Sequence, residues 1–280
     1  MSLILAATPL GNPGDATARL KSAIAEATII AAEDSRRFHR LCTDIEVVFT
    51  ARVISFFEGN EEERTREILD ELSAGATVLV VSDAGMPTIS DPGFRLMRDA
   101  IKAGVDVQVL PGPSAVTMAV ALSGLPTDLF TFEGFPPRSS GARLATFEKL
   151  RFEERTMVFF EAPHRLGDSL GDAVSVFGSD RAAAICREMT KRYEETIRGS
   201  LAHLSTWADT HEVLGEITVV VAGADKDSAA VTADDMVARV REFEGAGMDR
   251  KGAIASVAAE FGIAKRLVYA AVVDANKMST

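Results

Sequence analysis

The sequence has few of the residues that mark extracellular or metal-binding proteins. It contains 2 cysteines, Cys42 and Cys186, without paired spacing, and its 4 histidines are scattered. Disulfide frameworks and zinc sites need several such residues at short, regular spacings. The sequence therefore predicts two reduced thiols, a cytoplasmic location and no metal site.

Long apolar runs are also missing. A transmembrane helix needs about 20 mostly apolar residues, whereas the near-continuous apolar stretches here have the length of strands. The first residues, MSLILAATPLGNPGD, lack a basic start, and their short apolar run leads directly into a turn. We therefore expect a first strand there, no signal peptide and no membrane partner.

A surplus of basic residues is absent as well, because the net charge is −11. General nucleic-acid binders usually carry a basic surplus. Many bases nevertheless flank turns in the second half of the chain: Arg138, Arg143, Arg165, Arg187, Lys191 and Arg192. We therefore expect any RNA binding to be local and selective.

Strand and helix patterns alternate through residues 1–125. The apolar, strand-like runs lie at 3–7, 28–32, 52–56, 77–81 and 107–111. The helical patterns between them lie at 15–27, 35–44, 60–75 and 94–104. This alternation predicts an α/β domain with a mostly parallel sheet covered by helices. Asn60 is expected to cap the third of these helices.

The pattern changes after residue 125. Residues 126–224 contain strands with fewer helices between them and predict a second α/β or α+β domain, while the small, acidic residues 225–236 predict a linker. Residues 237–280 predict a helical tail with helix-turn-helix-like spacing, which is compatible with nucleic-acid binding or with a packing hairpin. In this tail we expect one set of side chains to be buried: Ile254, Val257, Phe261, Leu267 and Val268. Another set is expected to be exposed: Arg250, Lys251, Lys265 and Arg266.

The loop VSDAGMPTISDPG is the strongest local signal of a site. Residues 82–93 separate a buried strand from a helix that begins near Phe94. Strand-to-helix loops usually take about 2–6 residues, and longer ones tend to be functional. Ligands of open α/β sheets bind beyond the carboxyl ends of the strands. The loop therefore predicts a ligand site.

Three more loops follow strands of the first domain: ATPLGNPGD (7–15), AEDSRR (32–37) and LPGPSAV (110–116). The first matches neither the G-x-x-x-x-G-K-S/T nor the G-x-G-x-x-G pattern, which argues against nucleoside triphosphates and dinucleotides. In the second, Asp34 or Ser35 is either a helix cap or a functional group. In the third, Ser114 can cap the next helix.

Two loops of the second domain carry charged side chains. FFEAPHR places Glu161, His164 and Arg165 after a strand, and CREMTKRYEE gathers bases and acids after another. Surface ion pairing explains the second cluster almost as well as RNA contact does. No Ser-His-Asp, Cys-His or two-carboxylate hydrolase arrangement stands out.

Taken together and in this order, these strings resemble a family of ribosomal RNA methyltransferases within the tetrapyrrole methylase superfamily. The resemblance covers roughly residues 3–223 and includes FEGFPPR, REMTK and GEITVVVAG. It implies a two-domain α/β fold with a small helical tail and a cofactor cleft between the domains. It also implies that S-adenosyl-L-methionine methylates the ribose 2′-hydroxyl of a cytidine in the decoding region of 16S ribosomal RNA, and that the protein is a homodimer acting on this RNA or on the small ribosomal subunit.

Site residues follow from the same resemblance by motif. The implied cofactor-binding residues are Pro9, Gly85, Met86, Ile89, Ser114, Ala115, Glu161 and Ala162. The family pattern His-Glu-His-Asn-Glu reads FEGNE here, so Phe57 and Gly59 stand in the histidine places.

Proton acceptors and phosphate contacts are proposed from residue chemistry. A ribose hydroxyl needs a general base, for which the candidates are Asp34, Glu58 and Glu188. Arginine matches phosphate bidentately, and the proposed RNA-binding residues are Arg36, Arg37, Arg138, Arg165, Lys265 and Arg266. The alternatives are a tetrapyrrole or other small-molecule methylase, and an RNA-binding module without catalysis. An arginine-rich rim speaks against a macrocycle, and intact glycine-rich loops speak against a module without cofactor.

Overall fold

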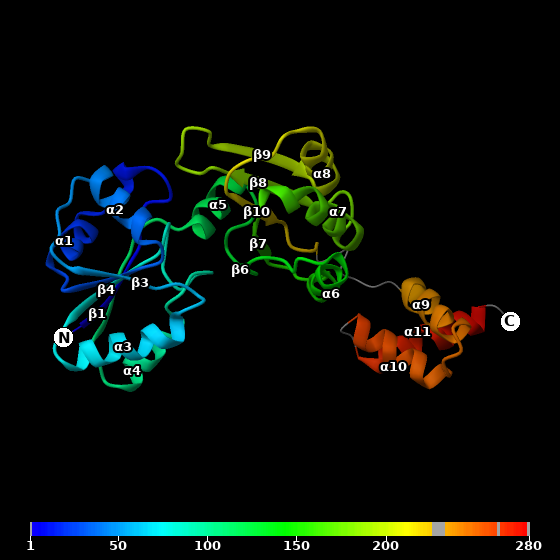
Figure 1. Cartoon of the computed structure of the whole chain (residues 1–280). Coiled ribbons are helices and arrows are strands. Elements are labelled where there is room, and N and C mark those ends of the chain that lie inside the picture. The colour runs from blue at the N-terminus through cyan, green and yellow to red at the C-terminus, as the bar shows by residue number, and fades with distance from the viewer. Residues whose placement is uncertain (1, 226–232, 262–263, 279–280) are drawn as a thin grey trace. The chain divides into compact units, whose positions relative to one another are not determined.

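A computed structural model of the chain describes residues 2–225, 233–261 and 264–278. Contacts divide the chain into two compact units, residues 1–223 and 224–280. The first unit contains two five-stranded sheets, and helices make up the second (Figure 1). Within the described ranges, no helix is long and apolar enough to cross a membrane.

The first sheet is parallel throughout, as the sequence predicts. Its strands are β1 (Ser2–Ala6), β2 (Ile29–Ala32), β3 (Arg52–Ser55), β4 (Thr77–Val81) and β5 (Val107–Leu110). They lie in the order β3-β2-β4-β1-β5. The central strands β2 and β4 are buried on both faces, which explains why their sequences are continuously apolar. The carboxyl ends of all five strands, and the loops that follow them, lie along one edge.

Helices cover both faces of this sheet. On one face lie α1 (Ala18–Glu26) and α2 (Ser35–Asp44), and on the other α3 (Glu61–Ser73) and α4 (Phe94–Lys102) (Figure 1). Leu20 and Phe38 pack in one core cluster, and Ile68 and Leu96 in the other. Burying each such side chain contributes roughly 1.5–3 kcal/mol.

Two expected helix caps are not formed. The Asn60 side chain makes no cap bond to α3. Its Oδ1 instead accepts from the Phe57 amide at 2.9 Å, and its Nδ2 donates to the Ser55 carbonyl at 3.1 Å. Asn60 thus holds the turn between β3 and α3. Ser114 likewise makes no side-chain cap bond to α5 (Ala115–Ser123).

The second sheet is mixed. Its strands are β6 (Phe130–Phe132), β7 (Thr156–Glu161), β8 (Ala182–Arg187), β9 (Glu195–Ser200) and β10 (Ile217–Val221), in the order β6-β7-β10-β8-β9. Only β6 and β7 pair in parallel; the other pairs are antiparallel. Antiparallel neighbours need no helical crossover, which accounts for the sparser helices in this part of the sequence.

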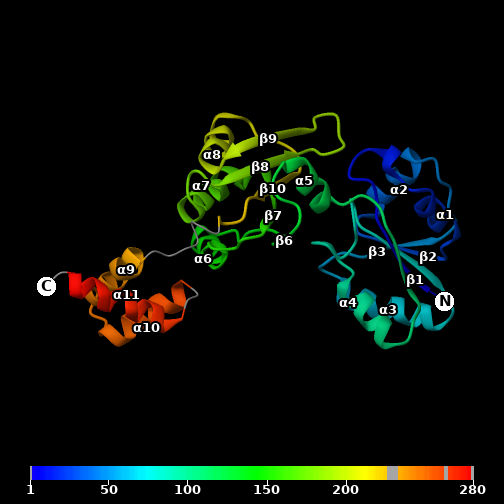
Figure 2. The same cartoon turned by 180° about the vertical axis from the view of Figure 1, so that it is seen from behind.

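Helices flank both faces of the second sheet (Figure 2). Helix α5 packs on one face through Val116 and Val120. On the other face lie α6 (Ser140–Leu150), α7 (Leu166–Phe177) and α8 (Leu201–Thr210). Short 3-10 turns precede α1 and α7, at Pro13–Asp15 and Pro163–Arg165. The predicted two-part α/β fold is thereby confirmed.

The second unit consists of α9 (Ala233–Gly245), α10 (Arg250–Glu260) and α11 (Lys265–Met278) around a core of its own. Ile254, Val257 and Val268 are buried as expected, and Phe261 is half-buried. Leu267 was expected in the core but is 49% exposed, because only one face of α11 meets α9 and α10.

The boundary of the tail differs from the one expected. Helix α9 begins at Ala233, inside the stretch 225–236 assigned to a linker. The first turn of α9 contains Asp234 and Asp235, whose negative charges are stabilised at the positive end of the helix dipole. The same two acids make residues 225–236 resemble a linker in composition. Residues 226–232 of that predicted linker lie outside the described residues.

Candidate functional site

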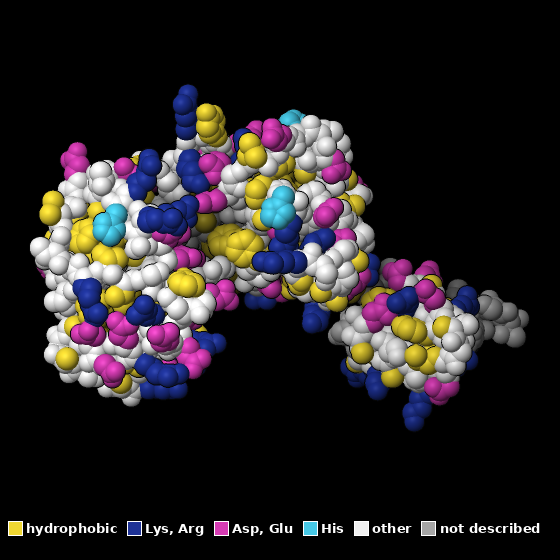
Figure 3. Space-filling model, in the orientation of Figure 1, with side chains coloured by type: hydrophobic (Ala, Val, Ile, Leu, Met, Phe, Trp, Pro, Cys, Tyr) yellow, Lys and Arg dark blue, Asp and Glu magenta, His cyan; other side chains and the backbone are white. Residues whose placement is uncertain are grey.

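A pocket of about 380 Å³ lies within the first unit, between its two sheets. Figure 3 shows the corresponding hollow, with basic side chains on both sides of it. One wall is formed by the loops after β1, β2 and β4 and by the start of α5. The other is formed by β7, β10, Phe135 after β6 and Met189 after β8. Its lining residues are Leu10, Glu33, Arg37, Asp83, Ala84, Ser90, Asp91, Ala115, Phe135, Phe160, Glu161, Ala162, Pro163, Met189, Gly215, Glu216, Ile217 and Thr218.

The long loop after β4 is anchored on the loop after β1. Thr8 and Gly85 exchange backbone hydrogen bonds of 2.9 and 3.0 Å. Gly85 has φ +78°, and a Cβ there would lie 3.2 Å from Leu10 Cδ2. Glycine at this position therefore permits both the positive φ and the close approach of the two loops.

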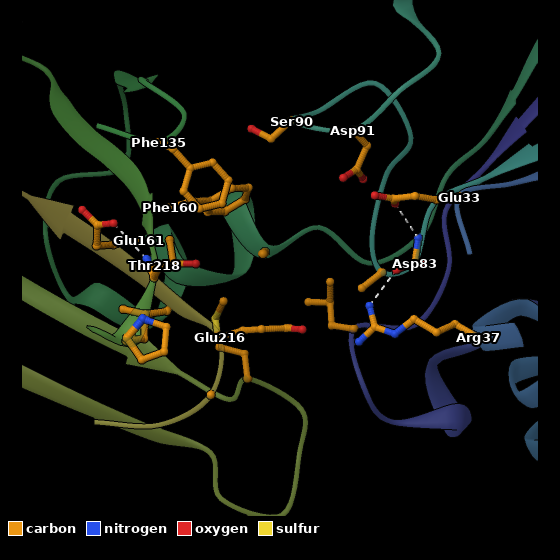
Figure 4. Close-up of a pocket in the computed structure, with 18 residues that line it drawn as sticks. Glu33, Arg37, Asp83, Ser90, Asp91, Phe135, Phe160, Glu161, Glu216 and Thr218 are labelled. Atoms are coloured by element: carbon orange, nitrogen blue, oxygen red, sulfur yellow. Dashed lines mark hydrogen bonds and ion pairs between the residues drawn. The ribbon is translucent and has the colours of Figure 1, made fainter. Parts of the chain in front are cut away.

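Acidic side chains form the wall beside the first sheet (Figure 4). Glu33 Oε2 accepts from the Asp83 amide at 3.1 Å. Asp83 Oδ1 accepts from the Asp34 amide at 3.1 Å, and its Oδ2 accepts from Arg37 Nη1 at 2.7 Å. These bonds join the ends of β2 and β4 and hold Glu33, Asp83 and Arg37 at the pocket.

Two of these carboxyls bind protons more tightly than usual. Burial, reinforced by the nearby charge of Glu33, raises the pKa of Asp91 to about 7. Burial also raises the pKa of Glu33, against the hydrogen bond from the Asp83 amide. The single arginine of the lining, Arg37, is already paired with Asp83. A cationic ligand group would relieve this excess of negative charge.

The opposite wall is largely apolar. Phe160 contacts the rings of Phe132 and Phe135 at centroid distances of 4.8 and 5.6 Å. Phe135 and Phe160 lie together across the pocket from Asp91 and Glu33 (Figure 4). The pocket thus combines an aromatic side with an acidic side, which suits a ligand that has a flat ring and a cationic end.

Glu161 closes the apolar wall at the end of β7. Its side chain is 1% exposed and lies 3.4 Å from Arg165 Nε. Its Oε1 also accepts from the Ala162 amide at 2.9 Å. The carboxylate is therefore compensated within the protein.

The connection from β8 to β9 forms the rim of the pocket. Lys191 Nζ pairs with Glu188 Oε1 at 2.8 Å and with Glu216 Oε2 at 3.0 Å. Glu188 Oε1 also accepts from the Glu216 amide at 2.9 Å. A Cβ on Gly215, which has φ +90°, would come within 2.4 Å of Glu188 Cγ. The glycine thus allows Glu188 to pack against the chain that enters β10.

Three of the eight implied cofactor residues line the pocket. Ala115, Glu161 and Ala162 belong to the lining. The others precede a lining residue or fall within the loop after β4: Pro9, Gly85, Met86, Ile89 and Ser114. Pro9 and Gly85 are buried in the junction of the two loops, whereas Ile89 is 41% exposed.

The three general-base candidates lie outside the lining. Asp34 caps α2, its Oδ1 accepting from the Arg36 amide at 2.8 Å. Hydrogen bonding to the Arg36 side chain lowers the pKa of Asp34. The pKa of Glu188 is lowered, because its hydrogen bonds to Lys191 and to the Glu216 amide outweigh the upward effect of burial. Glu58 is exposed in the β3–α3 turn. Asp34 thus caps α2, as one of its two interpretations expects.

The predicted phosphate contacts have different surroundings. Arg36 and Arg138 are exposed, and Arg37 lines the pocket while 61% of its side chain remains accessible. Arg165 is mostly buried and donates to the Pro136 carbonyl at 2.6 Å, so its guanidinium supports the wall. In the second unit, Lys265 and Arg266 are exposed at the start of α11.

One basic residue of the second half is not on the surface. Arg143 is 3% exposed and pairs with Asp172 Oδ2 at 2.6 Å. It also donates to the carbonyls of Pro137 and Arg138, both at 3.3 Å. Arg143 therefore fixes the turn before α6 and adds nothing to a cationic face.

Sequence reasoning missed most of the lining acids: Glu33, Asp83, Asp91 and Glu216. Glu33 and Asp83 each lie in the two positions directly after a buried strand, and this signal could have indicated them. Asp91 and Glu216 carried no such signal, because the folding of a long loop and the approach of the second sheet bring them to the pocket. Among the described residues, no group of three or more His, Cys, Asp or Glu side chains could hold a metal ion.

The chain is similar to known proteins over most of its length. A family model for tetrapyrrole (corrin/porphyrin) methylases matches residues 2–205. A relative from Mycobacterium tuberculosis, named ribosomal RNA small subunit methyltransferase I, is 50% identical over 98% of this chain and 95% of its own length. A relative of the same name from Halalkalibacterium halodurans is 38% identical over 96% of this chain and 93% of its own.

A solved structure resembles the fold. It is uroporphyrin-III C-methyl transferase from Thermus thermophilus complexed with S-adenyl homocysteine, with a TM-score of 0.54 and 16% identity, covering 79% of this chain and 97% of that one. At this identity the likeness concerns the fold alone. The family model and the full-length relatives show more: the chain belongs to the tetrapyrrole methylases and, within them, groups with the relatives named ribosomal RNA small subunit methyltransferase I.

Proposed function

We propose that this protein is a methyltransferase that uses S-adenosyl-L-methionine to methylate the ribose 2′-hydroxyl of a cytidine in the decoding region of 16S ribosomal RNA. The observation that carries the proposal is the pocket with one aromatic and one acidic wall at the carboxyl ends of parallel strands. The name shared by relatives up to 50% identical supports ribosomal RNA as the substrate. The cytidine and its 2′-hydroxyl follow from the sequence resemblance.

The lining suits this cofactor chemically. S-adenosylmethionine carries a planar adenine, a positively charged sulfonium and a methyl group activated for transfer. Phe160 and Met189 offer apolar contact for a flat ring. Glu33 and Asp91, whose pKa values burial raises, gain stability near a positive charge. We propose that Glu33 lies against the sulfonium of the cofactor.

The protein must then orient the ribose, exclude water and accept a proton. Alignment of the reacting groups can account for several kcal/mol of the barrier. We propose Asp91 as the proton acceptor, because it lines the pocket and its pKa of about 7 lies close to neutral pH. Asp34, Glu58 and Glu188 remain alternatives that act only if the chain rearranges on binding RNA.

Single-turnover methylation of small ribosomal subunits tests both parts of this proposal. Tritium transfer from labelled cofactor, followed by mass spectrometry of the RNA, identifies the modified nucleotide. Asp91→Asn is expected to lower the rate by about 10²–10⁴-fold, with smaller effects for Asp34→Ala, Glu58→Ala and Glu188→Ala. Absence of transfer by the parent protein would refute the function. A normal rate in Asp91→Asn would refute only the role of Asp91.

We also propose that the protein is a homodimer. Exposed apolar side chains on α4 support this, since Phe94 and Ile101 are 57% and 58% exposed. The neighbouring edge strand β5 adds Val109, which is 48% exposed. Sedimentation at micromolar concentration should give a species twice the chain's mass, and a monomer alone would contradict the proposal. Phe94→Ser should then shift the equilibrium toward monomer.

A further inference from the structure

The β8–β9 connection, residues 188–194, extends from the second sheet toward the first (Figures 1 and 2). Lys191 crosses to the loop after β1, where a Cβ on Gly11 would lie 2.4 Å from Lys191 Cγ. Met189, at the base of the connection, lines the pocket. The tip of this hairpin, Arg192 and Tyr193, follows directly after Lys191, which contacts the loop after β1.

The tip presents an aromatic ring and a cation to solvent. Tyr193 is 63% exposed, and Arg192 is also exposed. The Arg192 guanidinium carbon lies 5.5 Å from the centroid of the Tyr193 ring. A tyrosine this exposed contributes little to the core. The part of its ring that Arg192 does not cover is open to a planar partner.

Other charges of the hairpin are already compensated. Lys191 pairs with Glu188 and Glu216, and Arg187 pairs with Glu195 at 2.8 Å. Glu194 Oε2 accepts from the Thr190 amide at 2.5 Å. Within the described ranges no carboxylate forms an ion pair with Arg192. Its guanidinium is therefore available to an external anion.

We propose that the hairpin tip binds an unpaired nucleotide of the RNA beside the target ribose. The base stacks on the Tyr193 ring, and the neighbouring phosphate accepts hydrogen bonds from Arg192. This inference rests on RNA being the substrate. RNA is favoured over a protein partner because a nucleotide offers a planar base for the Tyr193 ring and a phosphate for the Arg192 guanidinium.

The test measures RNA binding directly. A fluorescein-labelled single-stranded RNA with the decoding-region sequence is titrated with the full-length protein, and anisotropy is recorded at several salt concentrations. Tyr193→Ala should weaken binding about 5- to 150-fold, the range found for loss of one stacked base. Tyr193→Phe keeps the ring and should bind within about twofold of the parent. Arg192→Gln should weaken binding and flatten the salt dependence by about 0.7 log units per log unit of salt.

Lys149→Gln is the matched charge control, because Lys149 lies on α6, on the face of the second sheet opposite α5. It should leave RNA affinity unchanged, and cofactor affinity and melting temperature should stay at the parent's values in every variant. Parent-like RNA binding by Tyr193→Ala would overturn the inference. So would a loss of binding seen only with assembled subunits, because the tip would then contact a ribosomal protein.

Failure of the proposed function is distinguishable from failure of this inference. If the parent transfers no methyl group but Tyr193→Ala still weakens RNA binding, the function fails and the hairpin contact stands. If the parent methylates RNA and Tyr193→Ala has the parent's KM and RNA affinity, the hairpin contact alone fails.

Discussion

Glu33 and Asp83, which follow two neighbouring strands, are joined by a hydrogen bond of 3.1 Å from the Asp83 amide to Glu33 Oε2. The bond holds two carboxylates at one pocket wall, although like charges repel. Arg37 forms an ion pair with Asp83, whereas burial outweighs the charge interaction of Arg37 with Glu33 and raises the pKa of Glu33. The arrangement leaves Glu33 ready to interact with a positively charged ligand.

Replacing Glu33 should therefore affect a charged ligand more than a neutral analogue. Glu33→Gln is expected to weaken S-adenosylmethionine binding roughly 5- to 20-fold, about 1–2 kcal/mol. S-adenosylhomocysteine lacks the sulfonium charge, so its affinity should change less. Isothermal titration calorimetry of both ligands measures the difference. Equal losses for the two ligands would show that Glu33 does not act on the sulfonium.

Asp91 should make the stability of the protein depend on pH. Its pKa is raised to about 7 in the folded state, from an ordinary value of 3.8, mainly by burial. The folded state therefore holds this proton more tightly than the unfolded state. The contribution of Asp91 to stability is most favourable below pH 3.8 and is lost as pH rises toward 7.

Asp91→Asn removes this ionisation. We expect the variant to melt a few degrees above the parent at about pH 8, with a smaller difference at about pH 5. Differential scanning calorimetry at both pH values measures it. Asp99→Asn is a suitable control, because Asp99 is a surface acid whose pKa is lowered by its hydrogen bond to Arg98. A pH-independent difference between Asp91→Asn and the parent would contradict the prediction.

Gly215 should be needed for packing at the rim. Gly215→Ala adds a Cβ within 2.4 Å of Glu188 Cγ, while the Glu188 carboxylate is held by Lys191 and the Glu216 amide. We expect a loss of about 2–4 kcal/mol in the free energy of unfolding, measured by urea denaturation. Gly104→Ala is the matched control, since Gly104 has φ +72° but no atom within 4 Å of the added Cβ.

Gly104→Ala should cost about 1–2 kcal/mol, from backbone strain alone. The difference between the two variants measures the collision with Glu188. Equal losses would mean that the rim adapts without cost.

The second unit is proposed to contact RNA. Removing residues 226–280 should leave cofactor affinity nearly unchanged, because the pocket lies entirely within the first unit. RNA binding should weaken and its salt dependence flatten by about 0.7–0.9 for each lost phosphate contact. The double variant Lys265→Gln, Arg266→Gln should reproduce part of the change without altering the fold. An unaltered salt slope with lower thermal stability would favour the alternative, a packing hairpin.

Local order was largely determined by the sequence. The continuous apolar run of β4 predicted a strand buried on both faces, and the structure has it at Thr77–Val81, as expected. Helix α2 likewise spans Ser35–Asp44, with Asp34 as its cap. Such features depend on hydrophobic periodicity and capping chemistry, which act over a few neighbouring residues. For the same reason the strand-to-helix loops were identified as candidate site elements.

Tertiary structure alone decided which side chains meet. Asp91 and Phe160 are 69 positions apart in sequence and line one pocket because two separate sheets approach each other. Arg143 and Arg165 look like surface bases in the sequence, yet packing turns both inward onto carbonyl groups. Composition records that a charge is present, whereas its partners and its solvent exposure are fixed only when distant segments pack together.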